Sequence, residues 1–251
     1  MKLSEVPMSG PVPRLEVPGW RQRFGLAAGI TWRGDGAPPG FDLGLWTRDP
    51  VEDVMGRWRD FRQAEYGVGA VVMAHQVHGA EVAWHVDPSG WVIHDGLDGH
   101  ATDRPGVMLC VTVADCTPVY LAAPRQGAFA LLHAGWRGAA AGILERGVSL
   151  LRGRTGALPG EMVAHLGVAI CGPCYEVGGE VLEAFGRPVE GQGPWHLDVR
   201  AQLMRRAEGL GIGEVTTSGW CSAHDRKRFF SHRRSRGADG RMVAFLGRPV
   251  A

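Results

Sequence analysis

Short runs of apolar residues alternate with helix-like patterns along this chain. The runs are rich in Val, Leu and Ala, and Gly, Pro or Asp bounds most of them, as is typical of buried strands. This pattern predicts strands at 71–73, 82–84, 107–113, 119–121, 128–132, 163–170, 215–217 and 242–246. No internal repeat and no long linker divides the pattern. The sequence therefore predicts one α/β domain with a mixed sheet.

Three segments change to the helical period. After Arg137, apolar residues recur at the i, i+3, i+4 spacing as far as Leu151, which predicts an amphipathic helix. A second helix is predicted over 176–185. A third helix should begin after Asp198, whose side chain is suited to cap a helix N-terminus, and continue to Leu210.

The first nineteen residues differ from the rest of the chain. They contain four prolines and lack the charged and then apolar start of a signal peptide. We expect residues 1–19 to form a flexible N-terminal arm and residues 20–251 to form the catalytic domain. No apolar run is long enough to predict a membrane span. Five widely spread cysteines do not suggest a disulfide framework, so we expect a cytoplasmic protein.

Charge and composition narrow the classes of partner. The chain has 251 residues, of which 45% are hydrophobic, enough for a sizeable core. Its net charge is only +1, so no overall field directs it to nucleic acid or to a membrane. The basic segment 226–236 is interrupted by Phe229 and Phe230, which resemble core residues, and fits a phosphate-sized anion better than nucleic acid. We expect small-molecule partners and a monomer or weak homodimer.

Three strand-like segments each carry one good ligand for a soft metal. These are His78 in Gln-Val-His-Gly, Cys116 in Ala-Asp-Cys-Thr-Pro and His133 in His-Ala-Gly-Trp-Arg-Gly. They are 38 and 17 residues apart, so only a folded domain can bring them together. One thiolate and two imidazoles suit zinc, and three protein ligands leave a position for water or substrate. The pattern predicts a catalytic metal site at strand ends, where α/β sheets bind ligands.

These motifs, together with the tail Arg-Phe-Phe-Ser-His-Arg-Arg at 228–234, resemble the laccase-domain family. This family is also called YfiH-like or multicopper polyphenol oxidase, and many members are named purine nucleoside phosphorylases. The resemblance extends from about residue 29 to the end of the chain. The chain departs from the family pattern at Asp42, His224 and His232, where members often have Asn, Cys and Tyr.

The resemblance implies a single layered domain with mixed β-sheets flanked by helices, similar to the catalytic domain of cytotoxic necrotising factor toxins. It implies zinc on His78, Cys116 and His133. It also implies phosphorolysis of adenosine, inosine, guanosine and S-methyl-5'-thioadenosine, with adenosine deamination as a second reaction.

Phosphorolysis needs groups that bind phosphate near C1′ of the ribose and stabilise the charge of the leaving purine. Arginine binds phosphate in a bidentate manner, and the candidates are Arg137, Arg233 and Arg234. Arg57 is a weaker candidate.

Deamination needs an activated water at C6 of adenine and a carboxylate that carries its proton. Asp115, next to Cys116, is the obvious carboxylate. Because neighbours on a strand point to opposite faces, the alternative is that Asp115 is hydrogen-bonded to a ligating histidine. We expect His75 and Gln76 to line the substrate pocket, although His75 is also a candidate fourth ligand.

Other functions suggested by the sequence are less well supported. Cys171 and Cys174 have the C-x-x-C spacing of redox enzymes, but the corresponding stretch of the family is a turn without redox function. A copper-dependent polyphenol oxidase needs further copper ligands, usually in His-x-His pairs, and the sequence has none of these among its ten histidines. Copper could still occupy the zinc site, because its intrinsic affinity is higher.

Two further classes stay open. Cys116 and His133 are a nucleophile and base for a hydrolase or amidase acting on peptidoglycan precursors, as the toxin-like fold suggests. The chain is alternatively a metal-binding protein without enzymatic activity.

Overall fold

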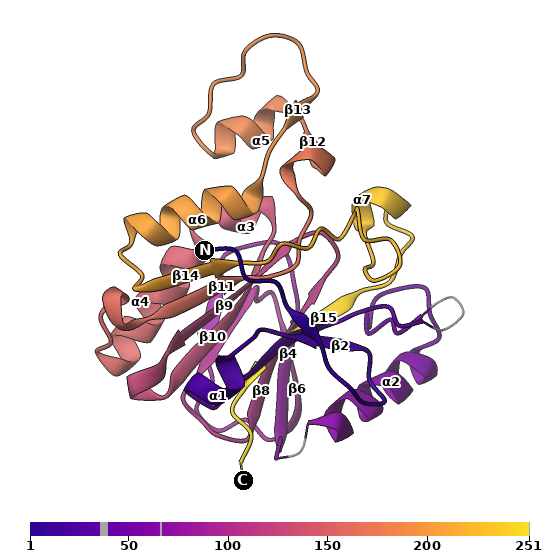
Figure 1. The fold of residues 1–251 in the computed structure, drawn as a ribbon, viewed down its shortest axis with the longest axis vertical. Coiled ribbons are helices and arrows are strands. Elements are labelled where there is room, and N and C mark those ends of the chain that lie inside the picture. The colour runs from indigo at the N-terminus through magenta and orange to yellow at the C-terminus, as the bar shows by residue number, and fades with distance from the viewer. Residues whose placement is uncertain (36–39, 66, 251) are drawn as a thin grey trace.

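Two mixed β-sheets stacked face to face form the centre of the protein (Figure 1). The structure is a computed structural model, and it describes residues 1–35, 40–65 and 67–250. The seven-stranded sheet contains, in spatial order, β1 (Val6–Pro7), β2 (Arg14–Glu16), β3 (Ala27–Thr31), β15 (Met242–Gly247), β8 (Val107–Val113), β4 (Ala70–His75) and β6 (Gly90–Asp95). The six-stranded sheet contains β14 (Glu214–Thr217), β11 (Val163–Leu166), β9 (Thr117–Ala123), β10 (Ala128–Ala134), β7 (Gly99–Thr102) and β5 (Val82–Trp84).

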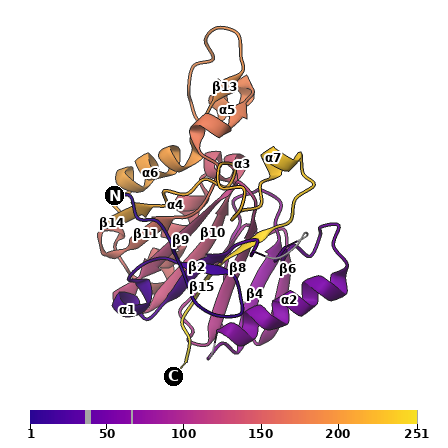
Figure 2. The same ribbon diagram turned by 45° about the vertical axis from the view of Figure 1, so that its right-hand side comes forward.

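Helices cover the outer faces of both sheets, as Figure 2 shows from a second direction. α2 (Val51–Ala64) covers the seven-stranded sheet, and α3 (Trp136–Ala140), α4 (Ile143–Thr155) and α6 (Val199–Gly209) cover the six-stranded sheet. The short α1 (Trp20–Phe24) places Trp20 in the core between the sheets, and α5 (Gly179–Ala184) and α7 (His232–Ser235) lie beyond the strand ends (Figure 1). A small antiparallel sheet of β12 (Glu176–Val177) and β13 (Trp195–His196) projects together with α5, which lies between them in the sequence. In the part of the chain that the structure describes, no helix is long and apolar enough to cross a bilayer.

The continuous apolar run of β8 is explained by burial on both of its faces. Successive side chains of a strand point to opposite sides. Met108 and Cys110 therefore pack beneath Trp58 of α2, whereas Leu109 and Val111 pack between the two sheets. A strand buried on both faces needs apolar residues at every position rather than at alternate positions.

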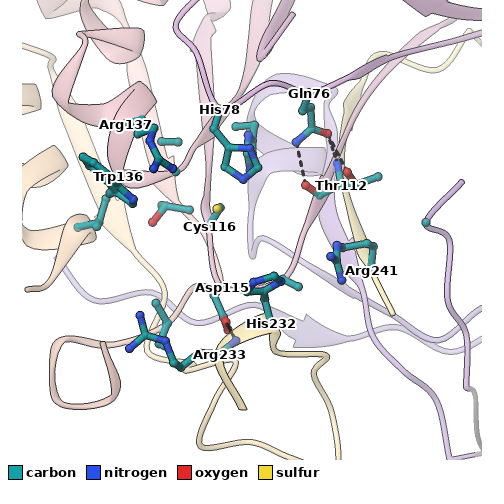
Figure 3. Close-up of a pocket in the computed structure, with 18 of the residues that line it drawn as sticks. Gln76, His78, Thr112, Asp115, Cys116, Trp136, Arg137, His232, Arg233 and Arg241 are labelled. Carbon is teal, nitrogen blue, oxygen red and sulfur yellow. Dashed lines mark hydrogen bonds between the residues drawn. The ribbon is translucent and has the colours of Figure 1, made fainter. Parts of the chain in front are cut away.

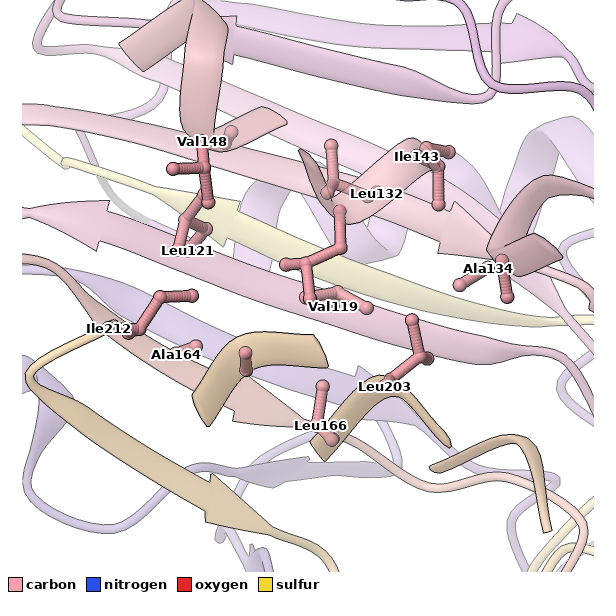
Figure 4. Packing of buried hydrophobic residues seen from close by; sticks show 14 of the residues in the cluster. Val119, Leu121, Leu132, Ala134, Ile143, Val148, Ala164, Leu166, Leu203 and Ile212 are labelled. Carbon is pink, nitrogen blue, oxygen red and sulfur yellow. The ribbon is translucent and has the colours of Figure 1, made fainter. Parts of the chain in front are cut away.

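The strands β9 and β10 are buried in the same way on the other side of the molecule. Val119, Leu121 and Leu132 face outward from the six-stranded sheet and contact the helical layer (Figure 4). Ile143 of α4 and Leu203 of α6 cover them. The order of layers is therefore helix, sheet, sheet, helix, and the predicted mixed α/β fold is confirmed. The likeness to the toxin domain stays a prediction.

Several predicted elements have different bounds in the structure. The helix predicted after Arg137 is two helices, because Gly142 adopts a left-handed conformation (φ 87°) between α3 and α4. The predicted strand 163–170 ends at Leu166, and the predicted helix 176–185 begins with the two residues of β12. The cap is confirmed, since the Asp198 carboxylate accepts a hydrogen bond from the N–H of Ala201.

The expectation of a flexible arm at residues 1–19 is corrected by the structure. β1 and β2 extend the edge of the seven-stranded sheet, where Leu15 is buried opposite Ile30. The prolines are tolerated because an edge strand leaves one row of backbone groups unpaired. Glu5 is also buried, and its carboxylate accepts hydrogen bonds from Ser218 at 2.6 Å and from His165 at 3.1 Å. The boundaries proposed for the catalytic domain stay a prediction.

Candidate active site

The structure brings His78, Cys116 and His133 together at one edge of the two sheets. Figure 3 shows His78 and Cys116 of this group in the cavity. The ligand atoms of these side chains all lie within 4.8 Å of one another. His78 follows β4, Cys116 lies in the turn that joins β8 to β9, and His133 is near the end of β10. Since β8 and β9 belong to different sheets, the turn between them carries the thiol to the junction of the sheets.

A buried carboxylate that the sequence analysis missed orients two of these residues. Asp98 has no exposed surface and accepts a hydrogen bond from Nδ1 of His133 at 2.8 Å. This bond leaves the Nε2 side of the His133 ring for a ligand. The pairing of β7 with β10 sets Asp98 beside His133, and the His133 N–H donates to the Asp98 carbonyl at 2.7 Å. The residues next to Asp98 in the sequence form no motif, so its hydrogen bond to His133 could be found only from the pairing of these strands.

The same carboxylate holds the turn that presents His78. The backbone N–H groups of Val77, His78 and Gly79 donate to Asp98 at 3.3, 3.0 and 2.7 Å. His78 has a φ of 60°, a left-handed conformation that is uncommon for a residue other than glycine. The three hydrogen bonds stabilise this conformation, which directs the imidazole toward Cys116.

The surroundings of Cys116 favour a thiolate. Burial raises the pKa of its thiol, but the charge and hydrogen bonds of His133 and His78 outweigh burial and lower the pKa from 9.0 to about 6. Burial lowers the pKa of His133, and the charge of Cys116 together with the Asp98 hydrogen bond raises it to about 9. A thiolate beside an imidazolium is therefore the favoured state near neutral pH.

Two glycines bring helix α3 close to this site, Gly135 at its N-cap and Gly138 within it. A Cβ on Gly135 would be 3.0 Å from the His78 ring and 3.2 Å from the Cys116 sulfur. A Cβ on Gly138 would overlap the carbonyl oxygen of Gly79. The glycines of the His-Ala-Gly-Trp-Arg-Gly motif thus permit close packing of α3 against both other ligand segments.

A cavity of about 390 Å³ opens in front of the three ligands. The sequence analysis predicted part of its lining, which includes His75, Gln76, Asp115, Arg137 and Arg233. Lining residues that it did not predict are Trp46, Thr112, Tyr175, His232 and Arg241. Trp46, Thr112 and Arg241 come from segments without a chemical motif, whereas Tyr175 follows the C-x-x-C motif and His232 lies in the 228–234 tail, where the motif itself did not indicate a place in the cavity.

Asp115 lines the cavity but does not contact a ligating histidine. Its φ of 86° belongs to a turn, so the strand alternation expected for Asp115 and Cys116 does not apply. One carboxylate oxygen accepts a hydrogen bond from the Ser222 hydroxyl and the other from the backbone N–H of Arg233, both at 2.6 Å. The partner of the ligating histidine is Asp98 instead.

The four candidate arginines have different environments. Arg137 and Arg233 line the cavity, with their guanidinium groups stacked on Trp136 and Tyr175. Arg234 lies outside the lining, and its guanidinium is occupied by the carbonyls of 222, 223 and 229 and by the Asp239 carboxylate.

Arg57 is also outside the lining, because its guanidinium is bonded to Asp49 and to the carbonyl of Gly40. The structure therefore gives no support for Arg57 or Arg234 as a phosphate ligand, and that assignment stays a prediction.

Comparison with known proteins identifies the group to which this architecture belongs. The sequence model of the family described as multi-copper polyphenol oxidoreductase laccase matches residues 28–249. The chain belongs to this family. It is 34% identical over 250 residues to purine nucleoside phosphorylase YlmD of Geobacillus stearothermophilus, an alignment that covers 89% of this chain and 90% of that protein. It is 34% identical over 243 residues to a purine nucleoside phosphorylase of Deinococcus radiodurans, covering 94% and 91%.

The family fold is also seen in a solved structure. The crystal structure of YlmD from Geobacillus stearothermophilus superposes with a TM-score of 0.87 at 30% identity, covering 98% of this chain and all of that one. The extent of this match confirms the fold expected of the laccase family over nearly the whole chain.

In this member of the laccase family, His75 and Gln76 form one wall of the cavity. Gln76 is hydrogen-bonded to Thr112 through both ends of its amide, which ties the end of β4 to β8 (Figure 3). The Nδ1 of His75 is 3.0 Å from the Asp95 carboxylate, and its ring lies against Trp46. His75 is not part of the metal-ligand group, so the structure does not support it as a fourth ligand.

Proposed function

We propose that this chain is a zinc-dependent purine nucleoside phosphorylase. It would convert adenosine, inosine, guanosine or S-methyl-5'-thioadenosine and phosphate into the free base and the sugar 1-phosphate, and it would deaminate adenosine in a second reaction. The observation that carries the proposal is that one cavity joins the His78, Cys116 and His133 group to the guanidinium groups of Arg137 and Arg233. The names of the relatives support the same reaction.

The donor set fits zinc. It offers a thiol with a lowered pKa and two imidazoles, one of which has its other nitrogen fixed by Asp98. Bound there, zinc would supply a Lewis acid that polarises a water or a substrate group in the cavity. Copper fits the same three donors, so the bound metal must be identified by analysis.

The two lining arginines are suited to bind phosphate. The Arg137 guanidinium stacks on Trp136 at 4.4 Å and makes no hydrogen bond to residues 1–35, 40–65 or 67–250, so its donors are available. Arg233 stacks on Tyr175 at 4.9 Å and donates one hydrogen bond to the carbonyl of Glu176. In the proposed reaction the two groups hold phosphate so that one of its oxygens attacks C1′ of the ribose, and they offset the charge that develops.

Asp115 has a positioning role in this proposal rather than that of a proton carrier. Its carboxylate accepts from the backbone of Arg233, and this bond fixes the start of α7 at the cavity. Ser222 holds the second carboxylate oxygen. Asp115 thereby keeps the Arg233 side chain within reach of a bound phosphate.

The experiment that tests this proposal compares both reactions in Arg137→Ala. Removing a charged bidentate contact should cost about 1.5–3 kcal/mol of binding to the phosphate in the transition state. The rate of inosine phosphorolysis should therefore fall roughly ten- to more than a hundred-fold. Deamination of adenosine needs no phosphate and should change much less. Arg152→Ala, an exposed residue of α4, is the matched control and should leave both rates unchanged. Equal losses in both reactions would show that Arg137 holds the nucleoside or the fold, and phosphate-independent release of base would refute phosphorolysis.

The lowered pKa of Cys116 favours a second candidate, a hydrolase or amidase. A thiolate beside the His133 imidazolium is the arrangement of a cysteine nucleophile, which would act on peptidoglycan precursors. Metal removal separates the two functions. The phosphorylase should lose its activity with the metal and regain it with zinc, whereas a cysteine hydrolase should become more active and form an acyl-enzyme on Cys116.

A further inference from the structure

A second group of soft-metal ligands lies outside the cavity lining. It consists of the side chains of Cys171, Cys174, Cys221 and His224, and their ligand atoms all lie within 4.8 Å of one another. Three sulfurs and one imidazole are the donor set of many four-coordinate structural zinc sites. None of these four residues takes part in the proposed reaction.

The contacts in this group are direct. Nδ1 of His224 is 3.6 Å from the Cys171 sulfur, and Nε2 of the same ring is 3.2 Å from the Cys174 sulfur. The backbone N–H of Cys171 donates to the Cys221 sulfur at 3.3 Å. The four side chains therefore converge on one point, with the imidazole against two of the three sulfurs.

The backbone supports the same interpretation. Cys171 and Cys174 flank a tight turn with the sequence Gly-Pro, and Cys221 and His224 flank a second turn with the same spacing. A β-bridge between Ala169 and Cys221 holds the two turns side by side, although α5, α6 and β14 lie between them in the sequence. Two ligand pairs, each separated by two residues and each on its own turn, are the usual construction of a structural zinc site.

Redox chemistry fits this arrangement less well. A reactive C-x-x-C motif commonly relies on a helix N-terminus to stabilise its thiolate. Here the last three residues of the motif themselves form the short 3-10 helix Gly172–Cys174, and a third cysteine and a histidine contact the motif. The four donors together are better suited to a metal ion than to a disulfide exchange between two of them.

We propose that Cys171, Cys174, Cys221 and His224 bind a structural zinc ion, distinct from the metal proposed in the cavity. The ion would clamp together two segments that shape the cavity wall. Tyr175, directly after Cys174, lines the cavity, and Ser222, directly after Cys221, donates to the Asp115 carboxylate. Loss of the clamp should therefore loosen the cavity wall without removing any residue that lines the cavity.

Elemental analysis of protein purified without oxygen tests this inference. The wild-type chain should contain two zinc ions, and Cys174→Ser should contain one fewer. Cys116→Ser should lose the other ion and keep the one in the clamp. His224→Cys, which restores a fourth donor, should retain both ions, and Cys110→Ala, which removes a buried thiol outside both groups, should do so as well. Cobalt substituted into Cys116→Ser should give the intense thiolate-to-metal absorption of a three-sulfur site.

The outcomes separate this site from the proposed function. If the cavity binds no metal, the wild-type chain and Cys116→Ser should contain one zinc ion each, and Cys174→Ser should contain none. The inference is overturned if Cys116→Ser, folded and reduced, contains no zinc. Mass spectrometry of the wild-type chain that finds a disulfide among the three cysteines after anaerobic purification would also overturn it.

Discussion

The fully buried carboxylate of Asp98 accepts a hydrogen bond of 2.8 Å from Nδ1 of His133, whose imidazole is almost completely buried. The same carboxylate accepts a hydrogen bond from the backbone N–H of His78 at 3.0 Å, so one side chain orients both histidines of the candidate metal group. The geometry of the proposed metal site therefore depends on Asp98, which is not one of the three candidate ligands.

Asp98→Asn should weaken metal binding about 10- to 100-fold, the usual cost of losing the partner of a ligating histidine. The amide has one acceptor oxygen where the carboxylate has two. It therefore cannot accept all the hydrogen bonds that His133 and the backbone of the His78 turn now donate. Competition with a chelator measures the change in affinity. Asp95→Asn, which alters an exposed carboxylate near His75, is the control. An unchanged metal affinity in Asp98→Asn would contradict this role.

The reactivity of Cys116 should follow its lowered pKa in metal-free protein. Since the thiolate alone reacts with iodoacetamide, alkylation at Cys116 should rise with pH around a midpoint of about 6, not around the ordinary 9.0. Peptide mass spectrometry separates Cys116 from the other cysteines. In His133→Ala the imidazolium is absent, and the midpoint should move upward. A wild-type midpoint near 9.0 would show that the two histidines do not stabilise the thiolate.

Two glycine substitutions should have opposite effects on stability. A methyl group at Gly138 overlaps the Gly79 carbonyl, so Gly138→Ala should destabilise the fold by about 1–3 kcal/mol and disturb the His78 turn. Gly153 lies in α4 with open space around it, so Gly153→Ala should stabilise the fold by about 0.5–1 kcal/mol. Urea unfolding measures both. Similar effects of the two substitutions would mean that the approach of α3 to Gly79 is not tight.

His100 should make the protein less stable in acid. Its burial, followed by the charges of His85 and His94, lowers its pKa from 6.5 to about 3, so the imidazole is neutral in the folded protein. Between pH 6.5 and about pH 3, the imidazole is protonated in the unfolded chain but not in the folded one. The free energy of unfolding must therefore fall as the pH falls below about 6.5. This dependence is about 1.4 kcal/mol per pH unit for one group, so His100 alone should lower the free energy of unfolding by about 2 kcal/mol between pH 7 and pH 5.

Unfolding of His100→Gln at both pH values tests this expectation. The variant should show a smaller difference in stability between pH 7 and pH 5 than the wild-type chain. The exposed His196→Gln should keep the wild-type difference. The same pH dependence in all three proteins would refute a role for His100.

The amino-acid sequence alone determined the features that depend on near neighbours. The apolar run 107–113 and the cap at Asp198 are local signals, because strand burial and helix capping involve a few consecutive residues. His78, Cys116 and His133 were also singled out locally, since each lies in a short motif at a strand end, and the structure brings the three side chains together. Their role as metal ligands stays a prediction.

Only the tertiary structure decided which side chains act together. The register of β7 against β10 sets Asp98 on His133, and nothing near either residue encodes that register. Arg233 and Arg234 are neighbours, yet one lines the cavity and the other is bound to backbone carbonyls, because the turn of α7 points them in different directions. Periodicity gives the type of each element, whereas pairing and packing between distant segments determine where a side chain points.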